Sequence, residues 1–125
     1  MIIYCCPDLL FASKITATAN ALGASHRPAR NAEMLRNRLN KVDDGKLNEA
    51  VTGVVVDLGL GDDALDLVRL VKEHDAALPV VVYGSHVAAD RLAQARAAGA
   101  DFVMANSQFA ANLPAILERL KGSEM

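Results

Sequence analysis

Two short runs of β-branched residues constrain the fold of this chain more than any other feature of its sequence. One run, "GVVVD", covers residues 53–57 and the other, "PVVVY", covers residues 79–83. Neither run alternates between apolar and polar positions, so a strand formed by either would be buried on both faces. Strands of this kind are typical of parallel sheets that helices cover on both sides. The two runs therefore predict an α/β protein.

Other predicted strands and helices alternate with these two runs along the chain. Because parallel crossovers are right-handed, this order predicts a three-layer sandwich, a (βα)5 doubly wound parallel sheet. The polar stretch 43–53 is expected to be a loop with room for one further helical turn. Strands are expected at 2–6 and 101–104, with a weaker one at 25–30. Apolar residues at helical spacing predict helices over 11–22, 31–42 (with Asn31 as N-cap), 64–73, 88–98 and 112–120.

The composition of the chain excludes several classes of function. Its 125 residues are 52% hydrophobic, which is enough for the core of one domain. The net charge is −2 and the 13 Lys and Arg residues are scattered, so no basic patch is available for nucleic acid. No apolar run approaches the roughly 20 residues of a membrane span, and the first residues lack the pattern of a signal peptide. We therefore expect a cytoplasmic protein with one domain, residues 1–125, and no nucleic-acid or membrane partner.

The two cysteines are adjacent, at Cys5 and Cys6. Adjacent cysteines cannot close a long loop with a disulfide within one chain. Because small thiols are common in buried strands, free thiols in a reducing compartment are expected. A strained vicinal disulfide or a redox sensor is the alternative.

Asp57 is the most informative polar residue, because it ends the first of the two β-branched runs. Function in a doubly wound sheet collects at the carboxyl ends of strands, where a carboxylate can bind a cation or accept a phosphoryl group. The alternative is that Asp57 only caps the following helix. Gly59 and Gly61 let the backbone pass close to a ligand, and Asp62 or Asp63 can serve as the N-cap. Asp57 is then free of capping, which favours the functional role.

Three stretches carry a family resemblance: "VVVDLGLGDDALDLVRLVKE" at 54–73, "LPVVVYGS" at 78–85 and "ARAAGADFVMA" at 95–105. In their order and spacing they resemble the receiver domains of bacterial two-component response regulators. The resemblance implies a flavodoxin-like sheet of strand order 2-1-3-4-5. It also implies phosphorelay signal transduction, in which a histidine kinase phosphorylates the central aspartate with the help of magnesium and the domain then signals to a partner.

The resemblance also assigns roles to single residues. Asp57 corresponds to the phosphoacceptor, and the backbone carbonyl of Gly59 corresponds to a magnesium ligand. The two acidic residues that complete the magnesium site in receivers align with Cys6 and Pro7, so both carboxylates are missing. Asp8, on the first turn of the next helix, is the nearby acid that could partly replace them. The pattern allows a weak magnesium site of Asp57, Asp8 and Gly59, and no other cofactor.

Two further receiver residues are replaced. The switch hydroxyl aligns with Gly84, although Ser85 follows it and could supply an equivalent oxygen. The lysine aligns with Ala105 or Asn106, and the loop after Asp57 is shorter than in receivers. Because phosphoryl transfer is catalysed mainly by positioning and charge neutralisation, these losses would slow it by several powers of ten. The pattern therefore favours a degenerate pseudo-receiver.

Other catalytic patterns have little support. His26, His74 and His86 lie at unrelated positions, so exposed or capping roles are favoured over a metal cluster. His86, Ser85 and Asp57 could form an acid, base and nucleophile set, but no nucleophile elbow accompanies them. No glycine-rich phosphate loop follows the first strand, and aromatic residues are few. We therefore do not expect an enzyme.

These observations predict a stand-alone signalling protein that binds another protein and has no output domain. Its expected contact surface is built from the fourth helix, the fifth strand and the fifth helix, residues 90–99 and 102–120. Because small alanine side chains permit close approach, a homodimer, a histidine kinase or a downstream signalling protein fits there.

Two alternative functions are left open by the sequence. The first is a working magnesium-dependent phosphoacceptor, with Asp57 phosphorylated by a histidine kinase, Asp8 as the second carboxylate and Ser85 as the switch hydroxyl. The second is a flavodoxin-like small-ligand or enzyme domain with a pocket at Cys6, Asp57 and Ser85.

Overall fold

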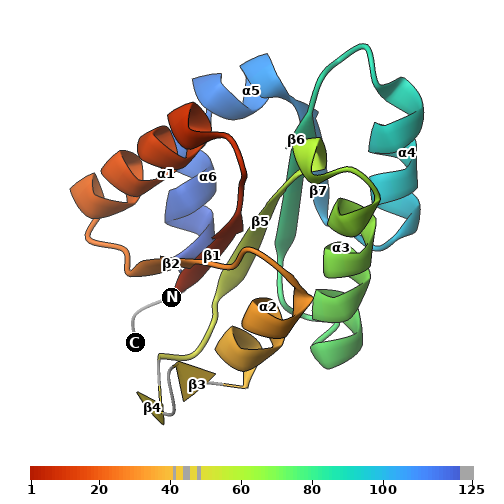
Figure 1. Ribbon diagram of the computed structural model, residues 1–125. Helices are drawn as coiled ribbons and strands as arrows, with labels where there is room; N and C mark the ends of the chain where they lie inside the picture. Colours follow the sequence, from red (N-terminus) through yellow and green to blue (C-terminus); the bar gives the residue numbers. More distant parts are fainter. Residues whose placement is uncertain (41, 44–45, 48, 122–125) are drawn as a thin grey trace.

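Five parallel strands form the centre of the computed structural model, which describes residues 1–40, 42–43, 46–47 and 49–121 (Figure 1). They are β1 (Ile2–Cys5), β2 (His26–Pro28), β5 (Gly53–Asp57), β6 (Val80–Gly84) and β7 (Phe102–Ala105). Their order is β2-β1-β5-β6-β7, which is 2-1-3-4-5 when only the strands of this sheet are counted. All neighbouring pairs are parallel. The predicted strand order is therefore confirmed.

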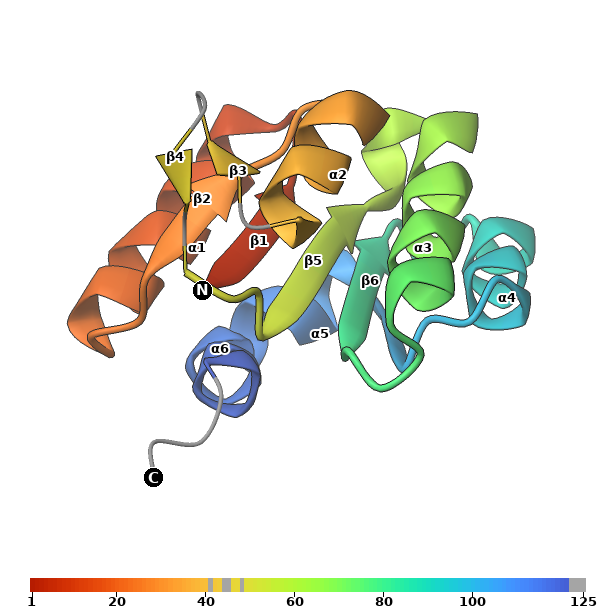
Figure 2. The same cartoon turned by 90° about the horizontal axis from the view of Figure 1, so that it is seen from below.

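Helices cover both faces of this sheet (Figure 1 and Figure 2). On one face lie α2 (Ala32–Leu39), α3 (Asp62–His74) and α4 (Ala89–Ala97). On the other face lie α1 (Leu9–Ala21), α5 (Asn106–Ala111) and α6 (Leu113–Leu120). A short 3-10 helix, η1 (Leu58–Leu60), joins β5 to α3. The predicted three-layer α/β sandwich is therefore confirmed.

Consecutive residues of the central strand enter two different cores. In β5, Val54 and Val56 belong to the core under α2 and α3, whereas Val55 belongs to the core under α1 and α6. All three side chains are fully buried. Because each buried valine contributes on the order of 1.5–3 kcal/mol, both faces of the strand select apolar residues. This double burial explains why the run does not alternate.

The stretch after α2 differs from the prediction. α2 has the expected N-cap, Asn31, but it ends at Leu39. Val42, the predicted end of this helix, instead lies in a short antiparallel hairpin of β3 (Val42–Asp43) and β4 (Lys46–Leu47). The predicted helix end is therefore wrong, and at residues 43, 46 and 47 so is the expected further helical turn. Residues 41, 44, 45 and 48 of the predicted helix and loop lie outside the described residues.

The segment after β7 forms two helices where the sequence predicted one. α5 ends at Ala111, and both the backbone N–H and the side-chain amide of Asn112 donate to the carbonyl of Gln108. Pro114 then stands in the first turn of α6, where a missing N–H costs little. With 6 residues, α5 is too short to show a helical period in the sequence. Its buried residue, Phe109, stacks on Tyr83 at the end of β6.

Candidate functional site

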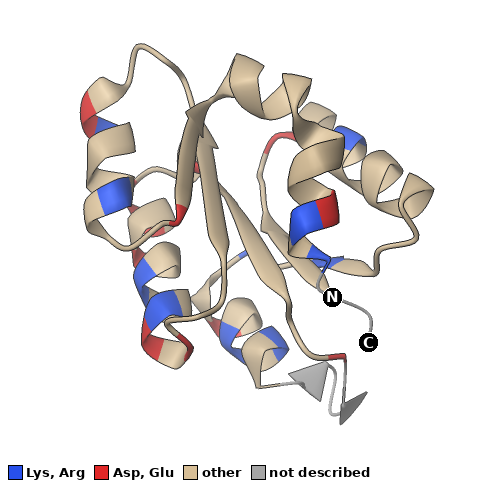
Figure 3. Ribbon diagram, turned by 180° about the vertical axis from the view of Figure 1, so that it is seen from behind, with Lys and Arg blue, Asp and Glu red and all other residues tan. Residues whose placement is uncertain are grey.

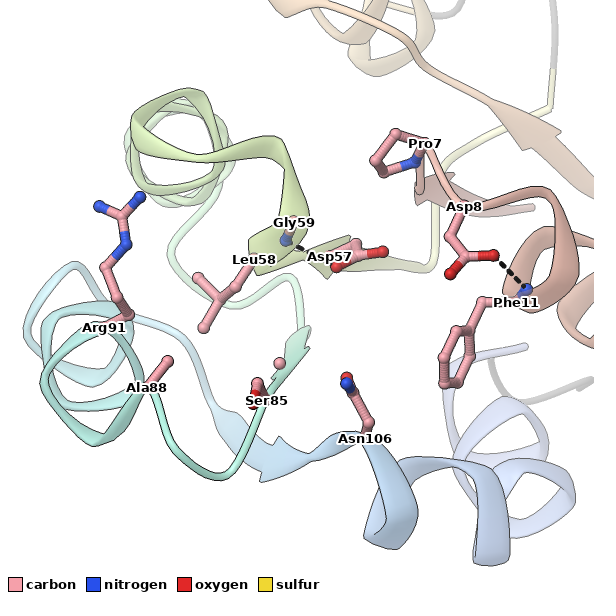
Figure 4. A pocket seen from close by; sticks show the side chains of 11 residues that line it. Pro7, Asp8, Phe11, Asp57, Leu58, Gly59, Ser85, Ala88, Arg91 and Asn106 are labelled. Carbon is pink, nitrogen blue, oxygen red and sulfur yellow. Dashed lines mark hydrogen bonds between the residues drawn. The ribbon is translucent and has the colours of Figure 1, made fainter.

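A cleft of about 540 Å³ lies at the carboxyl ends of β5 and β6 (Figure 4). The sequence predicts the functional site at this end of the strands. The cleft collects most of the predicted site residues, including Asp57, Asp8, Gly59 and Ser85. Its full lining consists of Pro7, Asp8, Phe11, Asp57, Leu58, Gly59, Gly84, Ser85, Ala88, Arg91 and Asn106.

Asp57 ends β5 and is almost buried, with 8% of its surface exposed. Its Oδ1 accepts a hydrogen bond from the Gly59 N–H at 2.7 Å and so caps η1. The expectation that Asp57 is free of capping is therefore wrong. The predicted N-cap at Asp62 or Asp63 is also wrong, because both residues lie in the first turn of α3. Gly61, with φ of 74°, takes the N-cap position without a side-chain cap.

The second carboxylate oxygen of Asp57 contacts two neutral side chains. The Tyr83 hydroxyl lies 3.2 Å from Asp57 Oδ2, and the Cys6 Sγ lies 3.6 Å from the same oxygen. The hydroxyl and the sulfur are themselves 2.8 Å apart. These three groups form a triangle behind the cleft, which we call the Cys6–Tyr83–Asp57 triangle.

Burial keeps the thiol and the phenol of this triangle protonated. Burial raises the pKa of the Cys6 thiol above its ordinary value, and it raises the pKa of the Tyr83 hydroxyl as well. Removal of water disfavours an anion in both cases. The neighbouring Cys5 thiol is deeply buried, which raises its pKa to about 12. Both cysteines are free thiols, as the sequence predicted.

Asp8 lines the cleft, but it does not lie on the first turn of α1 as expected. It is the N-cap residue, and its Oδ1 accepts hydrogen bonds from the backbone N–H groups of Leu10 at 2.8 Å and Phe11 at 3.3 Å. The first backbone N–H groups of a helix have no partner within the helix, so a side chain that accepts hydrogen bonds from them is strongly favoured at this position. One oxygen of the Asp8 carboxylate is therefore committed to the helix.

Leu58 closes the space beside Gly84, the residue that the resemblance aligns with the switch hydroxyl of receivers. A Cβ atom added to Gly84 would lie 2.8 Å from Leu58 Cδ1, so no larger residue fits without movement. Ser85 is exposed on the cleft, and its Oγ accepts a bond from the Val87 N–H at 3.4 Å. At the end of β7, Asn106 and not Ala105 lines the cleft.

The cleft contains a positively charged residue that the sequence reasoning did not single out. Arg91 on α4 lies at the far side, and its guanidinium forms an ion pair of 2.7 Å with Asp62. Figure 4 shows this guanidinium directed away from Asp57. The spacing between α3 and α4 that makes this pair cannot be read from the sequence.

The remaining predicted groups do not gather at one place. Cys6 lines a separate hollow near the ends of β1 and β2, so it does not share the cleft with Ser85. His26 lies 3.0 Å from the Asn20 side chain, and His86 is exposed and outside the cleft lining. Among the described residues, no group of three or more His, Cys, Asp or Glu side chains is placed to hold a metal ion. In the same part of the chain, no helix is long and apolar enough to cross a bilayer.

Tyr83 is a second residue of the site that the sequence did not reveal. It was assigned only to a buried strand, where aromatic residues are ordinary. The register pairs Tyr83 with Asp57 on neighbouring strands, which puts both side chains on the same face of the sheet. A signal existed in the polar tip of this tyrosine, because a buried hydroxyl needs a partner.

Solved structures with a similar fold include several response regulators. The receiver domain of NtrX from Brucella abortus is 20% identical, with a TM-score of 0.76 over 99% of this chain and 100% of that one. The phosphorylated cyanobacterial phytochrome response regulator RcpA is 15% identical, with a TM-score of 0.78 over 99% and 95%. A response regulator from Burkholderia pseudomallei, solved with a phosphorylated aspartic acid and a calcium ion, is 23% identical, with a TM-score of 0.68 over 95% and 65%.

No protein-family model and no curated protein matches the chain, so the likeness rests on three-dimensional structure. It covers nearly the whole chain and includes the strand order of the sheet. The protein therefore has the fold of a response-regulator receiver domain.

Proposed function

We propose that residues 1–125 act as a receiver-type two-component signalling domain, which binds another protein and is phosphorylated poorly on Asp57. The observation that carries this proposal is the neutral surroundings of the Asp57 carboxylate. Its hydrogen-bond partners are the Gly59 N–H, the Tyr83 hydroxyl and the Cys6 thiol. Asp57 keeps the place of a receiver phosphoacceptor at the end of the central strand, but its neighbours supply no charge.

Charge decides whether a phosphoryl group can reach an aspartate. The carboxylate and the phosphoryl donor are both anionic, so transfer depends on nearby cations that neutralise the oxygens. In this cleft the guanidinium of Arg91 is already paired with Asp62, and Asn106 offers only a neutral amide. Transfer to Asp57 is therefore expected to be slower by several powers of ten than with a complete set of charges.

The residues near Asp57 do not fit a magnesium ion well. Magnesium prefers oxygen ligands in octahedral geometry and is usually held by one or two carboxylates. The Pro7 side chain has no atom that can bind a metal ion, and the half-buried Cys6 thiol, whose pKa is raised, offers a soft protonated sulfur. Asp57 Oδ1 caps η1, and Asp8 Oδ1 caps α1. This donor set supports at most a weak site.

A contact surface for a partner protein is supported by α4, β7 and α6. β7 and α5 carry no charged residue, whereas charged residues of α4 and α6 flank them (Figure 3). A small apolar pocket of about 160 Å³ lies between β7 and α6, where Arg119 covers the Phe102 ring at 4.7 Å. An apolar centre with a charged rim is typical of protein interfaces.

The test of this proposal is adduct formation at Asp57. We expect no stable adduct when the protein is incubated with magnesium and beryllofluoride, followed by fluorine NMR and intact mass. Restoring the lost charges in a Cys6→Asp/Pro7→Asp/Asn106→Lys variant should allow an adduct to form. A stable adduct of the unmodified protein that disappears in Asp57→Asn would contradict the proposal.

A working phosphoacceptor is the second candidate, because Asp8 and Ser85 line the same cleft as Asp57. In that case the adduct would form in the unmodified protein. It would weaken in Asp8→Asn, which removes the second carboxylate, and in Ser85→Ala, which removes the hydroxyl.

A further inference from the structure

The hydroxyl of Tyr83 is enclosed beside the cleft and cannot turn to water. Tyr83 is fully buried, with 0% of its surface exposed. Its ring stacks on Phe109 with centroids 4.1 Å apart and planes at 7°, and the Phe11 ring lies 5.1 Å away. Because these rings fix the phenol in place, its hydroxyl must find an acceptor where it stands.

Two acceptors compete for the single proton of this hydroxyl. Asp57 Oδ2 lies at 3.2 Å and Cys6 Sγ at 2.8 Å. A phenol has one proton to donate, and sulfur is a weak acceptor. A hydrogen bond to a carboxylate is about twice as strong as one between neutral groups. The proton therefore goes to Asp57 while its carboxylate is free and ionised.

The sulfur of Cys6 is the second acceptor that the Tyr83 hydroxyl can use. Its own proton has a target in the Asp8 backbone carbonyl, which lies 3.3 Å from Sγ. With the thiol proton directed there, the sulfur lone pairs can accept from Tyr83. A chain from Tyr83 through Cys6 to the Asp8 carbonyl is thus complete without Asp57.

We propose that Cys6 is a standby acceptor for the Tyr83 hydroxyl, which lets Asp57 Oδ2 leave its tyrosine partner for a ligand in the cleft. The ligand class is a cation or an electrophilic group that occupies the same oxygen. Tyr83 is a positioning residue, which holds Asp57 while the carboxylate is free. The inference deepens the proposed function, since it assigns the exchange through which the Asp57 site responds to a ligand.

The test is a set of matched substitutions read by urea unfolding. Asp57→Ala removes the first acceptor and Cys6→Ala removes the second, so either variant alone leaves the hydroxyl one partner. The two substitutions together leave the buried Tyr83 hydroxyl without an acceptor. We expect the unfolding equilibrium constant of the double variant to rise about tenfold or more beyond the product of the single effects. In a Tyr83→Phe background, which has no hydroxyl, this excess should shrink to the smaller coupling of the direct contact between Cys6 and Asp57.

Additive effects in the presence of Tyr83 would overturn the proposal, and so would an equal excess in the Tyr83→Phe background. Serine at position 6 supplies a different acceptor. The Asp57→Ala/Cys6→Ser protein should therefore be more stable than the Asp57→Ala/Cys6→Ala protein. These measurements use no metal and no phosphoryl donor, so they succeed or fail independently of the adduct test.

A spectroscopic measurement covers the case in which the double variant does not fold. In a Tyr4→Phe background Tyr83 is the single tyrosine, because the chain has 2. Its ultraviolet absorption depends on the acceptor of its hydroxyl. We expect Cys6→Ser to shift this absorption more in the Asp57→Ala protein than in the protein with Asp57. Equal shifts in both proteins would overturn the proposal.

Discussion

The two carboxylate oxygens of Asp57 have different roles: one stabilises the local backbone, and the other contacts side chains of the site. Oδ1 accepts the Gly59 N–H and fixes the turn of η1, whereas Oδ2 meets Tyr83 and Cys6. The two interpretations of this residue, helix cap and presented carboxylate, are therefore not exclusive. A substitution at Asp57 changes the turn as well as the site, so its effects need a background in which the two can be separated.

The thiols beside this residue should be unreactive in the folded protein. Burial raises the pKa of Cys6 above the ordinary value of 9.0 and raises that of Cys5 to about 12. Because the thiolate is the nucleophile, iodoacetamide should react slowly at neutral pH. The half-buried Cys6 should react first as the pH rises above 9.0, and Cys5 only after unfolding. Peptide mass spectrometry would locate the modified thiol.

The same shift at Cys5 has a consequence for stability. The unfolded thiol ionises near 9.0 and the folded one near about 12, so the free energy of unfolding should fall as the pH rises through this window. Cys5→Ala is the matched control, since it should flatten the fall. Rapid alkylation of Cys5 in the folded protein at neutral pH would contradict both expectations.

The position of Asp57 could be predicted from the sequence, but its partner Tyr83 could not. A β-branched run that ends in an acid places the carboxylate at a strand end. The contact with Tyr83 depends on the register between β5 and β6, which pairs Asp57 with Tyr83. Two strands that each contain three consecutive buried valines, Val54–Val56 and Val80–Val82, give no sequence signal for that register.

At the level of elements, η1 and β6 pack so closely that one receiver residue has no room. Leu58 lies against Gly84, and a Cβ there would be 2.8 Å from Leu58 Cδ1. Gly84→Ser, which restores a hydroxyl at the aligned position, should therefore lower the free energy of unfolding by about 1–3 kcal/mol. Chemical denaturation measures this loss.

Leu58→Ala makes room for the new side chain and serves as the paired variant. Leu58 is nearly buried, so its removal alone should cost about 2–5 kcal/mol. The Gly84→Ser/Leu58→Ala protein should lose less than the sum of the two single variants. Additive losses would mean that the contact between η1 and β6 does not exclude the hydroxyl.

The elements themselves were predictable to different degrees. The central strands β5 and β6 follow from β-branched runs, and long helices such as α3 follow from their apolar period. α5 was missed because its 6 residues cover less than two helical turns. The hairpin of β3 and β4 was missed because its strands have only 2 residues each. Short elements depend on packing and caps that a local pattern does not contain.

In the whole molecule, the cleft and the expected contact surface share elements. Ala88, which precedes α4, and Asn106, the first residue of α5, both line the cleft. β7 is an edge strand of the sheet and contacts α4 on one face and α5 on the other. A partner that binds at α4 and β7 would therefore contact the walls of the Asp57 cleft directly. The proposed signalling through this surface would then need no covalent change at Asp57.

Magnesium binding tests most directly whether Asp57 has lost its charged partners. The ion would be titrated into isotope-labelled protein while NMR follows the backbone amides of Asp57 and Gly59. We predict binding weaker than the millimolar range, and tighter binding by about tenfold or more in Cys6→Asp/Pro7→Asp, because magnesium prefers carboxylate oxygens. Saturation below the millimolar range in the unmodified protein, lost in Asp57→Asn, would contradict the pseudo-receiver interpretation.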